Sequence, residues 1–422
     1  MLKIIKQLVL VCFVRFIHPL IIKSQQRWLH YRVMRGGKIR VVFLAMNLGM
    51  WRYQRVYERF VKDKRFEVKI VLSPSYQFEK SEQARDIQIL RNYFTSYSIP
   101  FVDWDFFNEE SLLNLRTDIR PDILFYPQQY RSVYYPDHSF VKFLDKLLCL
   151  CPYGLATEEE NWTYNTGFHN IAWKLFYTNR SELYAARRLA INKGKNVVVT
   201  GYPNMTEYLS KDNSHANDVW KVNDRRFKRI IWAPHYSINP HEDELYLSNF
   251  LRMADLMLLI ADEFKDRILI AFKPHPKLRT KLYAHPDWGV DRTDSYYKQW
   301  EESGNTQLET GAFIDLFKTS DAMIHDCDSF QIEYLYLNKP VMFVSNGVDQ
   351  KGTSLLREEA MKCHYIGRNN DDIRRFVNMV IRGEDIMEEK RQQFFKRYLL
   401  PENGTDVAFN IYNEILTALK LE

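Results

Sequence analysis

The chain has 422 residues, of which 46% are hydrophobic and 27% are charged. This composition excludes a disordered or collagen-like chain, and the length allows two domains of ordinary size, each with its own core. The five cysteines are too few and too irregularly spaced for a disulfide framework or a structural metal site, which favours a reduced, cytosolic protein.

The net charge of +6 comes from the amino-terminal end. Residues 1–40 carry nine of the 59 Lys and Arg residues and no Asp or Glu, so the rest of the chain is slightly acidic. A nucleic-acid-binding protein normally carries positive charge on its folded body. We therefore expect no nucleic-acid partner.

Residues 1–37 form an apolar segment that cations interrupt and flank. Lys6 and Arg15 lie within it, and its longest apolar run is only 8–14, whereas a spanning helix needs about 20 largely apolar residues. Cations and Trp28 follow, as in a helix that lies in the headgroup layer of an anionic membrane. The segment is predicted to be an amphipathic, membrane-associating helix. A true membrane span and a helix packed on the protein itself are the alternatives.

Residues 38–203 alternate short apolar runs with helix-length stretches. This alternation predicts a parallel, doubly wound sheet, which is a Rossmann-like domain. Strands are expected at 38–45, 66–72, 99–104, 121–126, 147–151, 175–177 and 196–200, and helices at 81–97 and 181–191.

A second series of the same kind occupies residues 204–400. Its strands are expected at 229–233, 267–272, 321–325, 340–344 and 363–366, and its helices at 243–264, 313–319, 329–337 and 371–382. Residues 401–422 contain a further helix at 405–419, whose apolar side chains recur with a helical period. The sequence thus predicts two Rossmann-like domains facing a central cleft, with ligands bound beyond the carboxyl ends of the strands.

The most informative segment follows the strand expected at 321–325. It reads Asp326-Cys327-Asp328-Ser329 and leads into a short helix, for which Asp328 or Ser329 is the predicted N-cap. Free N–H groups at this helix start would form an anion site that suits a diphosphate. Capping of a merely structural helix is the alternative, and a metal held by Asp326 and Asp328 is a weaker one.

Two other strands of this half run into a proline and then a histidine. They lead into Pro234-His235 and into Lys273-Pro274-His275-Pro276. The prolines restrict the backbone and so fix each imidazole at the carboxyl end of its strand. His275 could act as a general acid or as a phosphate-binding donor, with Lys273 as a phosphate-binding cation. We expect these segments and Ser329 to form one phosphate-handling site; a structural histidine in a turn is the alternative.

Two weaker candidates lie nearer the amino-terminal half. Glu158 begins an acidic triplet and could supply a catalytic carboxylate, although such triplets are usually solvated. Gly201 could contact the donor, although a turn that joins the two domains also explains it. The loop at 47–51 lacks the G-x-G-x-x-G pattern, which argues against simple dinucleotide binding.

Several short motifs recur in a recognisable order between residues 200 and 345. They are Gly201-Tyr202-Pro203, Ala233-Pro234-His235, Lys273-Pro274-His275-Pro276, Asp326-Cys327-Asp328-Ser329-Phe330, Glu333-Tyr334-Leu335 and Asn338-Lys339-Pro340. The set resembles the CDP-glycerol glycerophosphotransferase family, which builds teichoic-acid and related capsular polymers. The resemblance implies a GT-B fold, a CDP-linked polyol donor held mainly by the carboxyl-terminal half, and peripheral attachment to the cytoplasmic face of a bacterial inner membrane.

The resemblance also implies roles for individual residues. His275 would be a catalytic or phosphate-stabilising histidine, and the donor would contact Gly201, Pro234, Lys273, Asp326, Asp328, Ser329, Phe330 and Glu333. No metal and no organic cofactor are expected. Lys273 stands where the family often has arginine, which keeps the charge but loses bidentate geometry.

One departure concerns the base. The family usually presents a His-Gly pair in its amino-terminal half, and this chain has Tyr153-Gly154 there. The base would then come from His235, Glu158 or His169, or the acceptor and the reaction have diverged.

The predicted function is transfer of a polyol-phosphate group from a CDP-linked donor to a hydroxyl of a lipid-linked or saccharide acceptor, with release of CMP. A GT-B nucleotide-sugar glycosyltransferase for capsule or lipopolysaccharide is the first alternative and would release a nucleoside diphosphate. A non-catalytic membrane-surface module is the second alternative, because the His-Gly pair is missing.

Overall fold

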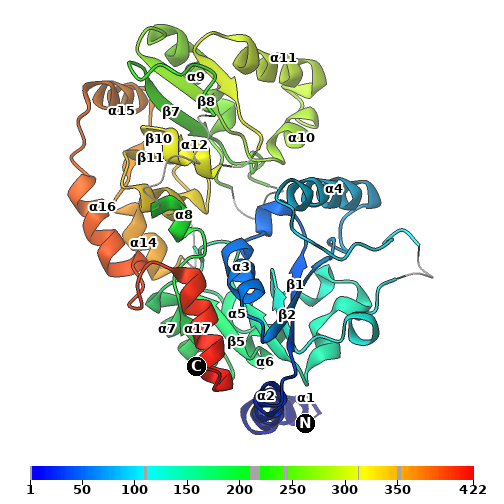
Figure 1. Cartoon of the computed structure of the whole chain (residues 1–422). Coiled ribbons are helices and arrows are strands. Elements are labelled where there is room, and N and C mark those ends of the chain that lie inside the picture. Colours follow the sequence, from blue (N-terminus) through cyan, green and yellow to red (C-terminus); the bar gives the residue numbers. More distant parts are fainter. Residues whose placement is uncertain are drawn as a thin grey trace. The chain divides into compact units, whose positions relative to one another are not determined.

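The computed structural model describes residues 2–108, 112–209, 219–241, 243, 246–311, 313–348 and 353–422. The chain divides into two compact units (Figure 1). Unit 1 comprises Met1–Leu155, Glu159–Thr206 and Leu399–Glu422, and unit 2 comprises Ala156–Glu158 and Glu207–Tyr398.

Unit 1 is built on a six-stranded parallel sheet with the strand order β2-β1-β3-β4-β5-β6. Most strand residues are buried, as expected when helices cover both faces of a sheet. The strands are β1 (Ile39–Ala45), β2 (Phe66–Leu72), β3 (Ile123–Tyr126), β4 (Leu147–Leu150), β5 (Lys174–Tyr177) and β6 (Val197–Val199). Its longer helices are α3 (Gln54–Lys62), α4 (Lys80–Ser96), α7 (Arg180–Leu189) and α17 (Val407–Leu419).

Helix α17 closes unit 1 although it follows unit 2 in the sequence. It packs against α3 (Figure 1), and the Tyr412 hydroxyl donates a hydrogen bond to the Asp63 carboxylate at 2.6 Å. The carboxyl-terminal helix is therefore part of the core of unit 1.

Unit 2 contains a second six-stranded parallel sheet, with the order β12-β11-β10-β7-β8-β9. The core on one face gathers Trp232, Phe250, Phe272 and Trp300, whose rings pack against each other. The strands are β7 (Lys228–Ala233), β8 (Ile268–Phe272), β9 (Thr306–Leu308), β10 (Ala322–His325), β11 (Val341–Val344) and β12 (Tyr365–Gly367). The main helices are α9 (Phe250–Glu263), α11 (Gly289–Glu302), α12 (Ile314–Thr319), α14 (Leu355–Met361), α15 (Asn370–Arg382) and α16 (Glu388–Phe394).

The predicted elements differ from the structure in several places. Helices α11, α14 and α16 were not predicted. The strand predicted at 99–104 is wrong, since only Val102 pairs there, in an isolated bridge to Val71. Pro100 in this stretch has no N–H to donate to a ladder. The helix predicted at 243–264 begins at Phe250, with residues 244 and 245 outside the described part of the chain. Strand β9 was not predicted, because its three residues include the polar pair Thr306 and Gln307.

The amino-terminal segment is helical and packs on unit 1. Helix α1 (Leu2–Cys12), a π-helical turn (Phe13–Ile17) and α2 (His18–Met34) follow one another without a break. A stripe of side chains with helical spacing is buried: Val14, His18, Ile22 and Leu29. One face of the segment therefore fits the alternative of a helix packed on the protein itself.

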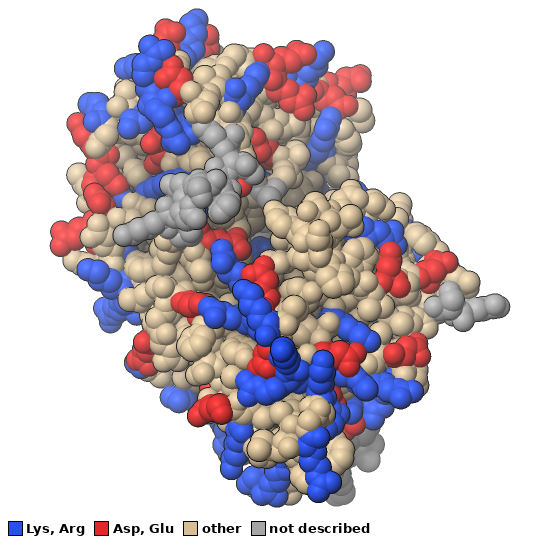
Figure 2. Space-filling view, viewed as in Figure 1, with Lys and Arg blue, Asp and Glu red and all other residues tan. Residues whose placement is uncertain are grey.

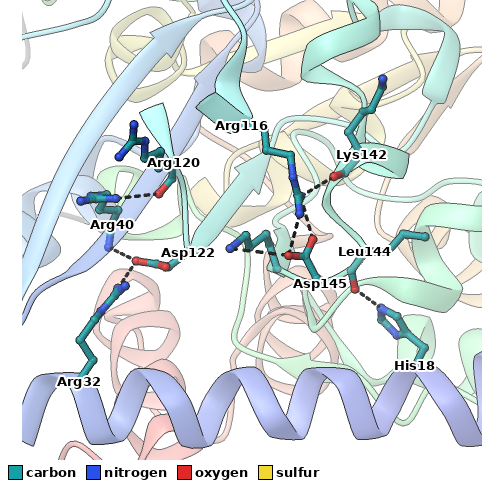
Figure 3. A network of polar contacts seen from close by, with 10 residues as sticks. His18, Arg32, Arg40, Arg116, Arg120, Asp122, Lys142, Leu144 and Asp145 are labelled. Atoms are coloured by element: carbon teal, nitrogen blue, oxygen red, sulfur yellow. Dashed lines mark hydrogen bonds and ion pairs between the residues drawn. The ribbon is translucent and has the colours of Figure 1, made fainter. Parts of the chain in front are cut away.

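Polar contacts near both ends of α2 hold it along unit 1 (Figure 3). The His18 ring contacts the Leu144 carbonyl oxygen at 3.1 Å. At the other end, Arg32 pairs with the buried Asp122, which also accepts the Arg40 backbone N–H at 2.8 Å. Among the described residues, Gln7–Met34 is also the one helical stretch long and apolar enough to cross a membrane, judged by length and composition.

Candidate active site

The predicted site residues of unit 2 gather at one edge of its sheet. β7 lies between β10 and β8, and the register pairs Ala233 with His325 and Trp232 with Phe272. The segments that follow these three strands therefore leave the sheet side by side. They lie where the strand order reverses, between β7 and β10, which is the usual ligand site of such sheets.

The two imidazoles lie against each other. The ring centroids of His235 and His275 are 5.2 Å apart, and the ring of Tyr236 packs against both. The His275 backbone N–H donates to the Pro234 carbonyl at 3.0 Å, which ties the two strand exits together. Pro234 thus holds the pair in place through its backbone.

Hydrogen bonds assign the tautomer of each imidazole. The Lys277 backbone N–H donates to Nδ1 of His275 at 3.1 Å. Nδ1 of His235 faces the Ser237 hydroxyl at 2.7 Å and the Ser237 N–H at 3.4 Å, and this hydroxyl oxygen accepts the Leu247 N–H. Since Nδ1 accepts in both rings, each neutral imidazole carries its proton on Nε2. Neither Nε2 has a hydrogen-bond partner within the described ranges.

Both imidazoles are neutral near pH 7. Burial lowers the pKa of His235 to about 4, and the Lys277 charge lowers it further against the opposing effect of Asp243. Burial lowers the pKa of His275 to about 3, with smaller contributions from His235 and from the two lysines. The pair therefore presents two uncharged Nε2–H donors, which suits phosphate oxygens and disfavours a general base at either Nε2.

Asp326 holds the loop that carries His235. Its side chain is 3% exposed and accepts the His235 N–H at 2.6 Å and the Asn249 N–H at 2.5 Å. Burial raises the pKa of this carboxyl to about 7, although the backbone N–H donors oppose the shift. Because both oxygens face protein N–H groups, Asp326 acts as a positioning residue and its predicted contact with the donor stays a prediction.

The predicted cap of the following helix does not form. The Ser329 side chain caps no N–H, and the Asp328 carboxylate accepts the Thr157 hydroxyl at 2.7 Å instead. Burial raises the pKa of Asp328, opposed by Thr157 and by Arg357. Helix α13 (Phe330–Glu333) starts here, and in the described part of the chain the N–H groups of Ser329 and Phe330 have no acceptor.

The other predicted donor residues of unit 2 are engaged within the unit. The buried Lys273 ammonium donates to the Gly311 carbonyl at 2.9 Å, and burial lowers its pKa. The ring of Phe330 packs against Phe313 and Phe317. Glu333 is buried and accepts the Tyr208 hydroxyl at 3.0 Å.

Glu158 belongs to unit 2 and neighbours Thr157, the partner of Asp328. It forms an isolated antiparallel bridge with Thr353. Burial lowers the pKa of Arg357, and the charges of Asp328 and Glu158 oppose this shift. Glu158, Asp328 and Arg357 thus form one charged group in this unit.

Gly201 and His169 belong to unit 1. Gly201 has a φ of +98°, and a Cβ there would lie 2.9 Å from Pro401 and from Val407, so packing alone requires glycine. Its predicted donor contact stays a prediction. His169 is buried and forms a capping box with Thr166 at the start of α6 (Gly167–Ile171). Burial lowers its pKa to about 3, which gives it a structural role.

The sequence did not reveal the residues that support the site. Ser237 sets the tautomer of His235, and the Asn249 N–H donates a hydrogen bond to Asp326. The Thr157 hydroxyl donates a hydrogen bond to Asp328. Ser237 and Asn249 lie in an irregular loop, and Thr157 lies far from Asp328 in the chain. Lys277 had a visible signal, since it follows the Lys273–Pro276 motif directly.

Solved structures of other proteins share this fold. The S. aureus MnaA-UDP structure has a TM-score of 0.55 at 14% identity, covering 91% of this chain and 97% of that one. UDP-GlcNAc 2-epimerase from Neisseria meningitidis bound to UDP-GlcNAc has a TM-score of 0.56 at 13% identity, covering 90% of this chain and 99% of that one. A variant of the wall teichoic acid polymerase TagF has a TM-score of 0.52 at 15% identity, covering 91% of this chain and 89% of that one. At these identities the likeness shows the fold alone, and with the two parallel sheets it confirms the predicted GT-B class.

The sequence comparison identifies the family. A search among curated proteins finds no match. A family profile described as CDP-Glycerol:Poly(glycerophosphate) glycerophosphotransferase matches residues 157–417, more than half of the chain. This range contains the histidine pair and all the unit 2 segments described above. The chain therefore belongs to the CDP-glycerol:poly(glycerophosphate) glycerophosphotransferase family, as its motifs predicted.

Proposed function

We propose that the protein transfers a glycerol-phosphate-like group from a CDP-linked donor to a hydroxyl of a lipid-linked or saccharide acceptor in the synthesis of a cell-surface polymer. The observation that carries this proposal is the pair of Nε2–H donors of His235 and His275 at the sheet edge that also holds Ser329. Family membership supports the donor class. A structurally similar protein, TagF, has been solved after a soak with CDPG.

In the proposed reaction, the acceptor hydroxyl oxygen attacks the β-phosphorus of the donor. A new P–O bond forms, the bond from the β-phosphorus to the bridging oxygen breaks, and CMP leaves with that oxygen. The two imidazole donors and the free N–H groups of Ser329 and Phe330 would stabilise charge on the phosphate oxygens. The hydroxyl proton passes to a base outside the histidine pair, for which Glu158 remains the predicted residue. In this proposal, the imidazole and backbone donors stabilise the phosphate charge without a metal or an organic cofactor.

The leaving nucleotide tests the proposal. Purified protein is incubated with CDP-glycerol or with a UDP-sugar, together with a membrane acceptor fraction, and released nucleotides are separated by chromatography. We expect CMP from CDP-glycerol and no UDP from the sugar donor. Release of a nucleoside diphosphate would establish the glycosyltransferase alternative, and absence of any turnover together with binding to lipid would establish the non-catalytic module.

We further propose that α1 and α2 attach the protein peripherally to the cytoplasmic face of a bacterial membrane. Besides its buried stripe, the segment exposes large apolar side chains, among them Phe16 (66% exposed), Leu20 (68%) and Trp28 (53%). Exposed cations flank them, and Figure 2 shows Lys and Arg side chains mixed with uncharged ones over this end of unit 1. The contacts of His18 and Arg32 keep α2 along the protein surface, which favours interfacial attachment over a span.

A triple variant tests this attachment. Phe16→Ser, Leu20→Ser and Trp28→Ser together should weaken binding to anionic phosphatidylglycerol vesicles at least about tenfold, because each side chain loses on the order of 2 kcal/mol of burial in the bilayer. Co-sedimentation measures the effect. A matched control replaces exposed apolar residues of unit 2, Leu259, Val290 and Ile386, with serine and should bind like the wild type. Equal binding by both variants would refute the attachment.

A further inference from the structure

A cavity of unit 2 opens beside the loop that carries His235. Its volume is about 430 Å³, and residues that follow β7, β11 and β12 line it. It therefore lies at the same carboxyl edge of the sheet as the histidines. The polar lining includes Ser248, Asn249, Arg252, Ser345, Asn346 and Arg368, and no Asp or Glu is among the lining residues. The described wall of the cavity carries two positive charges and no negative one.

The two arginines at this cavity are available to a ligand. Arg252 donates to the Asn249 side-chain oxygen at 3.0 Å and to the Arg368 carbonyl at 3.2 Å, which fixes the direction of its guanidinium. In the described ranges neither guanidinium has a carboxylate partner. Asp372, four residues after Arg368, accepts the Arg368 backbone N–H and pairs with Arg375.

Asn249, which lines the cavity, connects it to the proposed active site. The backbone and side-chain N–H groups of Asn249 donate to Asp326, and its side chain also donates to the Val344 carbonyl. Asp326 in turn accepts the His235 N–H. A continuous series of hydrogen bonds thus leads from the Arg252 guanidinium to the loop of His235.

We propose that this cavity binds a phosphodiester of the acceptor chain, a glycerol-phosphate unit of the growing polymer. The inference rests on the proposed function and deepens it. Guanidinium groups match phosphate oxygens in geometry and charge, and the Ser and Asn side chains suit glycerol hydroxyls. The volume lies within the range of small-ligand pockets and exceeds what a single phosphate fills. Transfer onto a poly(glycerophosphate) chain requires an anion-binding surface for the acceptor close to the donor phosphates.

Direct binding tests the cavity separately from turnover. The probes are a synthetic oligo(glycerol phosphate) and CDP-glycerol, titrated calorimetrically into the full-length protein. Arg252→Gln with Arg368→Gln should raise the Kd of the oligomer at least about tenfold, as expected for loss of two charge-assisted contacts. The Kd of CDP-glycerol should change less than about threefold. Arg368→Gln alone leaves the Asn249 contact intact and should produce part of the effect.

The control is a variant with the same change of charge, Arg226→Gln with Arg374→Gln, at exposed arginines of unit 2 paired with Asp224 and Glu263. It should bind the oligomer like the wild type. The proposal is overturned if the wild type does not bind the oligomer, if the control is equally weakened, or if CDP-glycerol binding falls as much as oligomer binding, which would assign the cavity to the donor. If no CMP is released but the oligomer still binds in an arginine-dependent way, the proposed reaction is rejected and the proposed role of the cavity stands.

Discussion

Replacing His275 with alanine should lower kcat for CDP-glycerol by tenfold to hundredfold, because a preorganised donor to the phosphate oxygens is lost. The tautomer refines this expectation. Glutamine can place an amide N–H near the position of Nε2, whereas asparagine mimics Nδ1, which faces the Lys277 N–H. His275→Gln should therefore retain more activity than His275→Asn, and initial-rate assays of CMP release would measure the difference.

The pH profile separates a neutral donor from a general acid. Burial lowers the pKa of His275 to about 3 and that of His235 to about 4, so neither imidazole of the free enzyme should change charge between pH 5 and 8. His275→Gln should thus lower kcat/KM by a similar factor throughout this range. Near-wild-type turnover of His275→Ala, or loss of an ionisation near pH 6.5 in the variant, would contradict the assigned role.

Much of the fold could be predicted because its strands are short apolar runs. Buried on both faces of parallel sheets, they stand out from their surroundings, and β2 was predicted at its observed bounds. The exceptions include one strand and one loop with weaker patterns. Strand β9 is short and partly polar. The irregular loop before α9 is held by hydrogen bonds of Ser237 and Asn249, which leave no periodic pattern in the sequence.

The candidate site could be predicted in outline only. Pro234-His235 and Pro274-His275 marked two strand exits, but their closeness depends on the strand order, in which β7 lies between β8 and β10. The cap predicted at Asp328 failed because Thr157, 171 residues earlier in the chain, donates to that carboxylate. Local sequence thus identifies which residue types stand at strand ends, whereas long-range contacts decide what each one does.

Asp326→Asn should reduce kcat/KM at pH 8 by about a hundredfold and lower the Tm. The carboxylate accepts N–H groups from His235 and Asn249, and an amide turns one of its two acceptors into a donor, which leaves a buried N–H unsatisfied at a cost of about 1–3 kcal/mol. Asp321→Asn is the matched control, since Asp321 accepts the Arg229 N–H at the opposite, amino-terminal end of β7. The control should lose stability and keep its activity in the surviving folded fraction.

The same carboxyl predicts a pH dependence with a definite sign. Because burial raises the pKa of Asp326 to about 7, the ionised form that accepts all of these N–H groups prevails above pH 7 and is lost as the pH falls. Wild-type kcat/KM should therefore decrease as the pH falls below 7, and the Asp321→Asn control should show the same decrease. Asp326→Asn has no proton to bind at this position, so its low kcat/KM should be flat across pH 6 to 8. If kcat/KM of Asp326→Asn still decreases near pH 7, the ionisation belongs to another group, and Asp326 does not position the His235 loop through its charge.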